Sequence, residues 1–70
     1  DEKSTRAKLL VMKCWIARDS DGRLYLHRQK PQLFSMVGLW DSDDWWDIDS
    51  NEYPEVTYEN SPREIELKLV

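Results

Sequence analysis

The sequence predicts an all-β fold: one small antiparallel sheet of about five short strands, either open or curled into a partly closed barrel, that begins with a β-hairpin. Three observations predict it. Apolar and polar residues alternate at a period of two in several short segments. Turn-forming residues recur roughly every 8–12 residues, and no segment has a convincing helical period. Seventy residues are enough for one domain with a modest core.

The chain divides into an N-terminal tail, residues 1–11, and a single β domain, residues 12–70. The tail begins with a polar stretch that has no apolar period and no reliable helix cap. Regular alternation starts at Met12, which is therefore the expected start of the natural domain.

The opening hairpin is predicted by two alternating segments on either side of an Asp-Gly turn. Residues 12–17 and 24–27 alternate, and Asp19-Ser20-Asp21-Gly22 lies between them. Asp and Ser favour turns through side-chain bonds to nearby backbone, and Gly adopts positive φ without steric cost. Pro31 ends the second strand because it has no N–H to donate.

The middle and end of the chain give shorter signals. Residues 32–39 fit neither template, so they form either a loop that inserts Phe34 into the core or a short strand. Residues 45–49 predict a short strand, residues 50–55 an irregular passage and residues 56–59 a short extended piece. Residues 64–70 alternate regularly and predict a half-buried last strand. The expected core consists of Cys14, Ile16, Leu24, Leu26, Trp46, Ile48, Ile65, Leu67 and Leu69.

Composition excludes several kinds of stabilising or functional site. One Cys and one His allow neither an intrachain disulfide nor the usual four-ligand Cys/His zinc site. No apolar run approaches the ~20 residues of a membrane span. Sparse cysteine is typical of a reducing compartment, so we expect a cytoplasmic protein with no cofactor and no membrane partner.

The charges are divided between the two halves of the chain. Residues 1–35 carry eight Lys or Arg and four Asp or Glu, whereas residues 36–70 carry two and ten. Such asymmetry has two interpretations. A basic hairpin can pair with acidic strands in one sheet, or each half can present a charged surface to a partner.

The acidic segment at residues 41–52 partly matches a calcium-binding EF-hand loop. Counted from Asp41, acids stand at loop positions 1, 3, 7, 9 and 12. However, Trp45 and Trp46 occupy positions 5 and 6, where that loop needs an oxygen ligand and a glycine. We therefore predict a solvated acidic loop and no metal site.

Catalysis is not expected. His27 has no Ser or Cys in a recognisable partner motif, and Cys14 alternates with core residues. No two of the many carboxylates stand apart as an acid/base pair.

Two functions remain as alternatives. The preferred one is a non-enzymatic protein-interaction module whose acidic, tryptophan-rich surface binds an unknown protein; its expected site residues are Trp40, Asp43, Asp44 and Trp45. The other is single-stranded nucleic-acid binding on a basic aromatic face that also includes Lys13, Arg18 and Lys30. Its expected site residues are Trp15, Arg23, Tyr25 and Arg28. A purely structural homodimer is a third possibility.

Several short motifs carry a resemblance to other proteins. They are Trp15-Ile16-Ala17-Arg18-Asp19, Asp21-Gly22, Leu24-Tyr25-Leu26, Lys30-Pro31, Pro54-Glu55-Val56-Thr57-Tyr58-Glu59-Asn60-Ser61-Pro62 and Glu64-Ile65-Glu66-Leu67. Through them, roughly residues 12–70 resemble short uncharacterised proteins of gut Bacteroidetes and of their phages and mobile elements. The resemblance implies no activity, cofactor or catalytic residue. It favours a small accessory or host–phage interaction protein.

Overall fold

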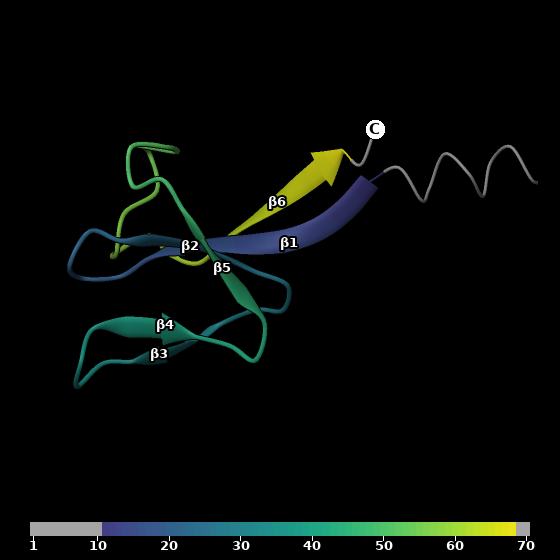
Figure 1. The fold of residues 1–70 in the computed structure, drawn as a ribbon. Coiled ribbons are helices and arrows are strands. Elements are labelled where there is room, and N and C mark those ends of the chain that lie inside the picture. Colours follow the sequence, from purple (N-terminus) through teal and green to yellow (C-terminus); the bar gives the residue numbers. More distant parts are fainter. Residues whose placement is uncertain (1–10, 69–70) are drawn as a thin grey trace, which may run out of the picture.

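Six β-strands in two antiparallel sheets form the computed structural model, which describes residues 11–68 (Figure 1). The larger sheet has the spatial order β5-β2-β1-β6 and comprises β1 (Val11–Arg18), β2 (Leu24–His27), β5 (Trp45–Ile48) and β6 (Arg63–Lys68). The smaller sheet is a hairpin of β3 (Gln32–Phe34) and β4 (Leu39–Asp41). The predicted all-β, antiparallel fold is confirmed. Among the described strands β5 and β6 are open edges, so the barrel alternative is wrong.

The opening hairpin forms where the sequence predicted it. β1 pairs with β2, with Arg18 opposite Leu24 and Ile16 opposite Leu26. The turn is closed by hydrogen bonds from the Asp19 N–H to the Arg23 carbonyl, 2.9 Å, and from the Gly22 N–H to the Asp19 carbonyl, 3.0 Å. Gly22 has φ 93°, the positive region that glycine occupies without strain.

Two later strands extend the hairpin into a four-stranded sheet. β5 adds to β2 and β6 adds to β1, both antiparallel. β1 begins at Val11, one residue before the predicted domain, while residues 1–10 lie outside the described part. The last strand begins at Arg63 and is described to Lys68, so the expected core residue Leu69 also lies outside it. No helix capable of crossing a membrane occurs in residues 11–68.

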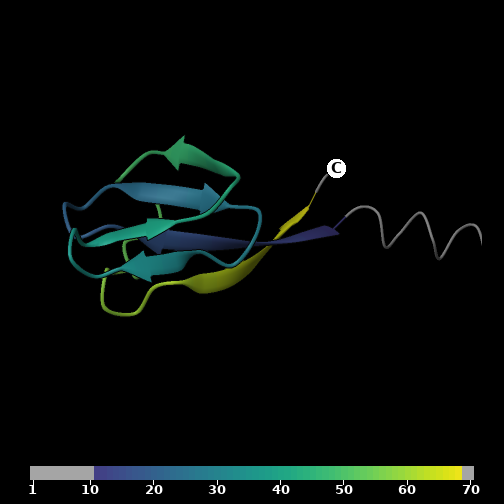
Figure 2. The same ribbon diagram turned by 90° about the horizontal axis from the view of Figure 1, so that it is seen from below.

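The sheet is covered on both faces. On one face Ile16, Leu24 and Val56 are buried together, and Ile48, Tyr53 and Ile65 pack against them. Val56 and Tyr53 come from the connection between β5 and β6, which lies over this face. On the other face the β3–β4 hairpin covers the sheet, and Figures 1 and 2 show the two coverings on opposite sides. Ala17 and His27 are therefore buried on a face that would otherwise be open to solvent.

The core is smaller and placed differently from the prediction. Cys14, Ile16 and Leu24 are buried as expected, whereas Leu26 and Leu67 are only half-buried. Trp46, expected in the core, is 50% exposed. It lies on edge strand β5 opposite Leu26, whereas the β5–β6 connection packs over the other end of β5, at Ile48.

The structure decides between the two alternatives for residues 32–39 and corrects one further expectation. Residues 32–34 form a strand, which confirms the strand alternative, and Phe34 is 51% exposed on it, so the loop that inserts Phe34 into the core is wrong. Residues 56–59 are not a strand, although Val56 is buried. Their backbone is shaped by a turn in which the Asn60 side chain accepts the Thr57 N–H, 2.7 Å.

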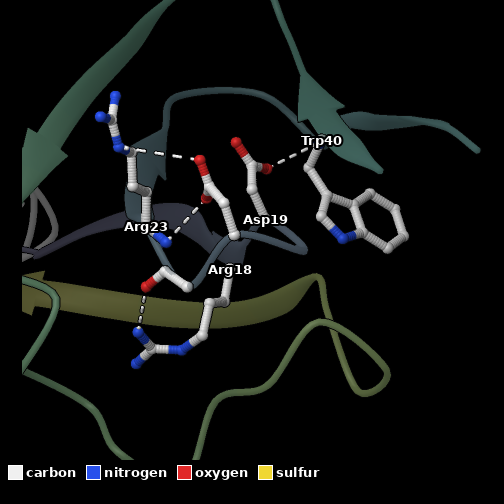
Figure 3. Close-up of polar contacts among 6 residues, drawn as sticks. Arg18, Asp19, Arg23 and Trp40 are labelled. Atoms are coloured by element: carbon white, nitrogen blue, oxygen red, sulfur yellow. Dashed lines mark hydrogen bonds and ion pairs between the residues drawn. The ribbon is translucent and has the colours of Figure 1, made fainter. Parts of the chain in front are cut away.

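Arg18 organises the irregular β5–β6 connection. Its guanidinium donates to five backbone carbonyls, of which four belong to this connection: those of Ser50, Glu52, Tyr53 and Val56, at 2.9, 3.2, 3.1 and 2.5 Å. The fifth, Gly22 in the first turn, is 2.8 Å away (Figure 3). A single planar group with five N–H donors thus fixes a segment that has no ladder of its own.

Gly38 fits the β3–β4 hairpin closely against the first turn. Its φ is 68°, and the Ser20 N–H donates to its carbonyl at 2.9 Å. A β-carbon at this position would overlap the Ser20 side chain, whereas one at Gly22 would meet nothing within 4 Å. Conformation and space therefore both require glycine at position 38.

We predict that Arg18→Lys lowers the free energy of unfolding by on the order of 2–3 kcal/mol, because an ammonium has three donors and cannot reach all five carbonyls. Chemical denaturation followed by tryptophan fluorescence measures the change. Arg23→Lys is the matched control, since Arg23 is exposed and its ion pair with Asp21 is open to solvent. Equal stability of the two variants would contradict the role given to Arg18.

Gly38→Ala is expected to destabilise the fold by about 1–3 kcal/mol through positive φ alone, and by more through the overlap with Ser20. Gly22→Ala carries only the conformational cost, so it should be the milder variant. Thermal unfolding of both variants under one buffer condition provides the comparison. If Gly22→Ala were the more damaging change, the close approach at Gly38 would not be a constraint.

Candidate functional site

A groove of about 530 Å³ lies between the larger sheet and the β3–β4 hairpin. Its walls combine carboxylates, aromatic rings and apolar side chains, and its volume falls within the range of roughly 300–1,000 Å³ typical of ligand sites. The residues that line it are Asp19, Asp21, Arg23, Tyr25, His27, Phe34, Val37, Leu39, Trp40, Asp41 and Trp45.

The groove exists because the first turn holds the hairpin at a fixed position. The Trp40 N–H donates to the Asp19 carboxylate at 2.8 Å, as Figure 3 shows, and the Ser20 N–H donates to the Gly38 carbonyl. These two bonds tie β4 and the turn before it to the end of β1. The hairpin is therefore held through its own backbone groups, the Trp40 N–H and the Gly38 carbonyl, and its side chains line one wall of the groove.

Asp19 is a buried carboxylate in this wall, with 5% of its surface exposed. Burial raises the pKa of Asp19 above its ordinary value, the hydrogen bond from Trp40 lowers it, and the nearby Asp21 and Asp41 raise it further. No Lys or Arg of residues 11–68 forms an ion pair with it. The groove therefore contains a buried carboxylate with which no cation of the described part of the chain forms an ion pair.

His27 is buried and makes a contact that the sequence did not suggest. Its Nδ1 lies 2.7 Å from the Ser42 hydroxyl, and that hydroxyl donates to the Asp44 carbonyl at 3.0 Å. The tautomer with its proton on Nδ1 satisfies both contacts, because the Ser42 oxygen then accepts the Nδ1–H, and it leaves Nε2 as an acceptor. Within residues 11–68 this buried Nε2 has no hydrogen-bond partner. Desolvation lowers the pKa of His27, opposed in part by the charge of Asp41.

His27 thus has a Ser partner in space, although no sequence motif indicates it. The arrangement still differs from a nucleophile and its base. A catalytic serine gives its proton to histidine, whereas the Ser42 proton points to the Asp44 carbonyl. The contact connects β2 to the β4–β5 connection.

Aromatic rings form the outer part of the groove. Tyr25 and Trp45 pack edge to face, with ring centroids 5.3 Å apart and an interplanar angle of 89°. Trp40 packs against Tyr58, with centroids 6.5 Å apart. Trp45 and Phe34 are each about half exposed, so their rings remain available to a partner.

The four residues of the predicted protein-interaction site occupy two places. Asp43, Asp44 and Trp45 lie in succession where the β4–β5 connection enters β5, and all three are exposed. Trp40 is half-buried, and its indole Nε1 is buried without a partner among residues 11–68. Trp40 is thus a wall of the groove and not an exposed anchor.

The four residues of the alternative nucleic-acid site are spread out and partly paired with acids. Arg23 lies 3.7 Å from Asp21 and Arg28 lies 3.9 Å from Asp44. Trp15 carries the Lys30 ammonium 5.5 Å from its ring centroid. Tyr25 contacts Trp45, so one residue of each predicted site belongs to the same aromatic pair.

Sequence reasoning missed the residues that give the groove its charge and its second wall. From the sequence, Asp19 belongs only to the turn, and Phe34 to a loop that enters the core or to a short strand. A turn-forming Asp carries no local signal that its carboxylate will be buried, since that depends on the distant β4. Pro31, directly before residues 32–34, was the one signal for a separate hairpin.

Metal binding receives no support from the described part of the chain. Among residues 11–68 no three His, Cys, Asp or Glu side chains gather as ligands of one ion would.

A second, smaller hollow of about 350 Å³ shares Phe34 and Asp41 with the groove and is lined mainly by polar side chains.

Comparison with known proteins identifies no relative: no protein-family model matches the chain, and neither a curated protein nor a solved structure does. The resemblance to short proteins of gut Bacteroidetes therefore stays a prediction.

Burial of His27 predicts a pH dependence of stability. Its folded pKa lies below the ordinary 6.5, so the unfolded chain binds the proton more tightly. As pH falls below about 6.5, the free energy of unfolding should decrease by up to about 1.4 kcal/mol per pH unit. His27→Asn, whose amide can still donate to Ser42, should lack this component between pH 7.5 and 5.5. Parallel pH profiles of the two proteins in chemical denaturation would contradict the assignment.

Proposed function

We propose that this protein is a small non-enzymatic interaction module that binds a partner protein carrying a basic segment. One observation above all supports the proposal: large apolar side chains are exposed together on the β3–β4 hairpin and at the start of β5, next to the acids of the β4–β5 connection. They are Leu33, Phe34, Met36, Val37, Leu39 and Trp45, of which Phe34, Val37, Leu39 and Trp45 line the groove. Monomeric proteins rarely expose such a group without a use for it.

The hairpin tip and the neighbouring acids give this surface its character. Met36 is 98% exposed at the tip, and Trp45 follows directly after the exposed Asp43 and Asp44. Tryptophan is a frequent anchor of protein interfaces, and rim charges select and steer the partner. An acidic rim around apolar anchors suits a basic partner segment.

Nucleic-acid binding is the weaker alternative. Of the cations expected on the basic face, Arg18 points to the other side of the sheet and is occupied by backbone carbonyls. Arg23 and Arg28 each lie beside a carboxylate. Acids among the aromatic rings would repel a phosphate backbone.

The proposal includes a cytoplasmic, accessory role. Cys14 is a buried free thiol whose pKa burial raises, so it is neither reactive nor paired. The resemblance to short proteins of gut Bacteroidetes and their phages adds a host–phage setting.

Selection of random short peptides displayed on phage, with this protein immobilised, tests the proposal. We expect enrichment of Lys-containing or Arg-containing peptides whose binding weakens as salt increases. The double variant Asp43→Asn/Asp44→Asn should weaken binding roughly three- to tenfold, and Trp45→Ser should weaken it further.

Glu64→Gln/Glu66→Gln is the matched control, because it removes the same charge from exposed positions of β6. If both double variants weakened binding equally, net charge and not this surface would be responsible. If the selection returned acidic peptides, or a single-stranded oligonucleotide bound more tightly than any peptide, the proposal would be wrong. A chain that elutes as a salt-resistant dimer with its Trp45 surface covered would favour the homodimer.

A further inference from the structure

We infer that the groove receives a lysine ammonium of the partner, held between the exposed rings at the rim and the carboxylate of Asp19. The inference rests on the proposed function, since it names the partner group that the same site takes.

The buried acid lacks a cation. Asp19 is 95% covered, and one of its carboxylate oxygens accepts the Trp40 N–H at 2.8 Å. No hydrogen bond from residues 11–68 reaches the other oxygen, which Figure 3 shows turned away from the Trp40 backbone. Burying a carboxylate without a cation is unfavourable. A cation that entered the groove would pair with the carboxylate and offset the cost of its burial. The pair would be stronger because the carboxylate is buried.

A second buried polar group in the wall is also unpartnered. His27 is 99% covered, and its Nε2 has no partner in the described part of the chain. With the proton on Nδ1, this nitrogen is an acceptor, as the free oxygen of Asp19 is. The free oxygen of Asp19 and this nitrogen are two acceptors in one groove and match the donors of an ammonium, while the buried indole N–H of Trp40 is an unpartnered donor in the same wall.

The rings at the rim suit the approach of a cation on an apolar stem. Trp45 and Phe34, each about half exposed, line the groove, and Tyr25 supports Trp45 from its edge. A cation within about 6 Å of such a ring centroid is attracted by its electron-rich face. The four-carbon stem of lysine would meanwhile contact the apolar side chains of the β3–β4 hairpin.

The geometry favours lysine over arginine. A guanidinium binds best when it donates two parallel bonds to both oxygens of one carboxylate. One oxygen of Asp19 is already engaged by the Trp40 N–H, so this two-pronged contact is blocked. An ammonium is a point charge and needs only one free oxygen.

The charges of the rim leave the groove negative. Three carboxylates line it, those of Asp19, Asp21 and Asp41, together with one cation, Arg23. Arg23 is drawn to Asp21 at 3.7 Å, on the exposed side of the turn. No ion pair within residues 11–68 involves Asp41, so two carboxylates remain for an incoming cation.

Titration of the ¹⁵N-labelled protein with a capped Gly-Ser-Lys-Ser-Gly peptide tests the inference. Two matched peptides carry acetyl-lysine or arginine in place of the lysine. We expect the lysine peptide to shift the indole N–H signals of Trp40 and Trp45. Acetylation, which removes the charge, should weaken binding about tenfold, and the arginine peptide should also bind more weakly than lysine.

Asp19→Asn is the decisive variant, because an amide oxygen still accepts the Trp40 N–H while the charge is lost. It should weaken lysine binding about tenfold, whereas Glu66→Gln, which removes a charge from β6, should leave it unchanged. Unchanged backbone signals of Asp19→Asn would show that the groove is intact. Asp41→Asn provides a second variant if Asp19→Asn does not fold.

Equal binding of the lysine and acetyl-lysine peptides, no binding of either, or full binding by both Asp variants would overturn the inference. In each case the peptides selected by phage display could still require Trp45, Asp43 and Asp44, and the proposed function would stand. Loss of that requirement, with lysine binding retained, would overturn the proposed function alone.

Discussion

The contact between Arg18 and five backbone carbonyls is the constraint on which the rest of this fold depends. Within residues 11–68 the core cluster has three buried members, and one of them, Val56, comes from a connection without regular structure. Small domains bury too little surface to tolerate a loose core. By fixing the carbonyls of residues 50–56, Arg18 places Val56 and Tyr53 over the sheet, and a polar side chain thereby determines how the apolar core closes.

The residue after Arg18 performs the matching task on the opposite face. Successive residues of an extended strand point to opposite sides, so Asp19, at the end of β1, accepts from the β3–β4 hairpin while Arg18 donates to the β5–β6 connection. Two adjacent residues of opposite charge thus hold the two coverings of one sheet. The groove is a consequence of the second contact, because it is the space left between the sheet and the hairpin that Asp19 positions.

Features that depend on residues close together in the sequence were predicted correctly, and features that depend on residues far apart in the sequence were missed. Residues 12–27 were predicted correctly as a hairpin because alternation and turn chemistry are local. The placement of Trp46 was wrong because exposure of an edge strand depends on where a distant connection ends. Arg18 was assigned to a basic surface, since nothing near it in sequence indicates the carbonyls, more than thirty residues away, that surround it. Candidate site residues were named for two separate functions, yet Trp40, Trp45, Arg23 and Tyr25 line one groove.

The contact between His27 and Ser42, which resembles that of a catalytic pair, also explains how a chain this small holds a surface segment in one position. His27 and Ser42 lie at the distance of a base and its nucleophile, but the Ser42 proton goes to the Asp44 carbonyl. The Arg28 N–H donates to that same carbonyl at 3.1 Å. The Asp44 carbonyl therefore accepts two hydrogen bonds, one from the Ser42 hydroxyl and one from the N–H of Arg28, the residue that follows β2. These bonds hold the segment that carries Asp43, Asp44 and Trp45 in place within the folded chain, and under the proposed function a surface held in this way would lose less conformational entropy on binding. The structural role of the Ser–His contact is therefore to order this segment.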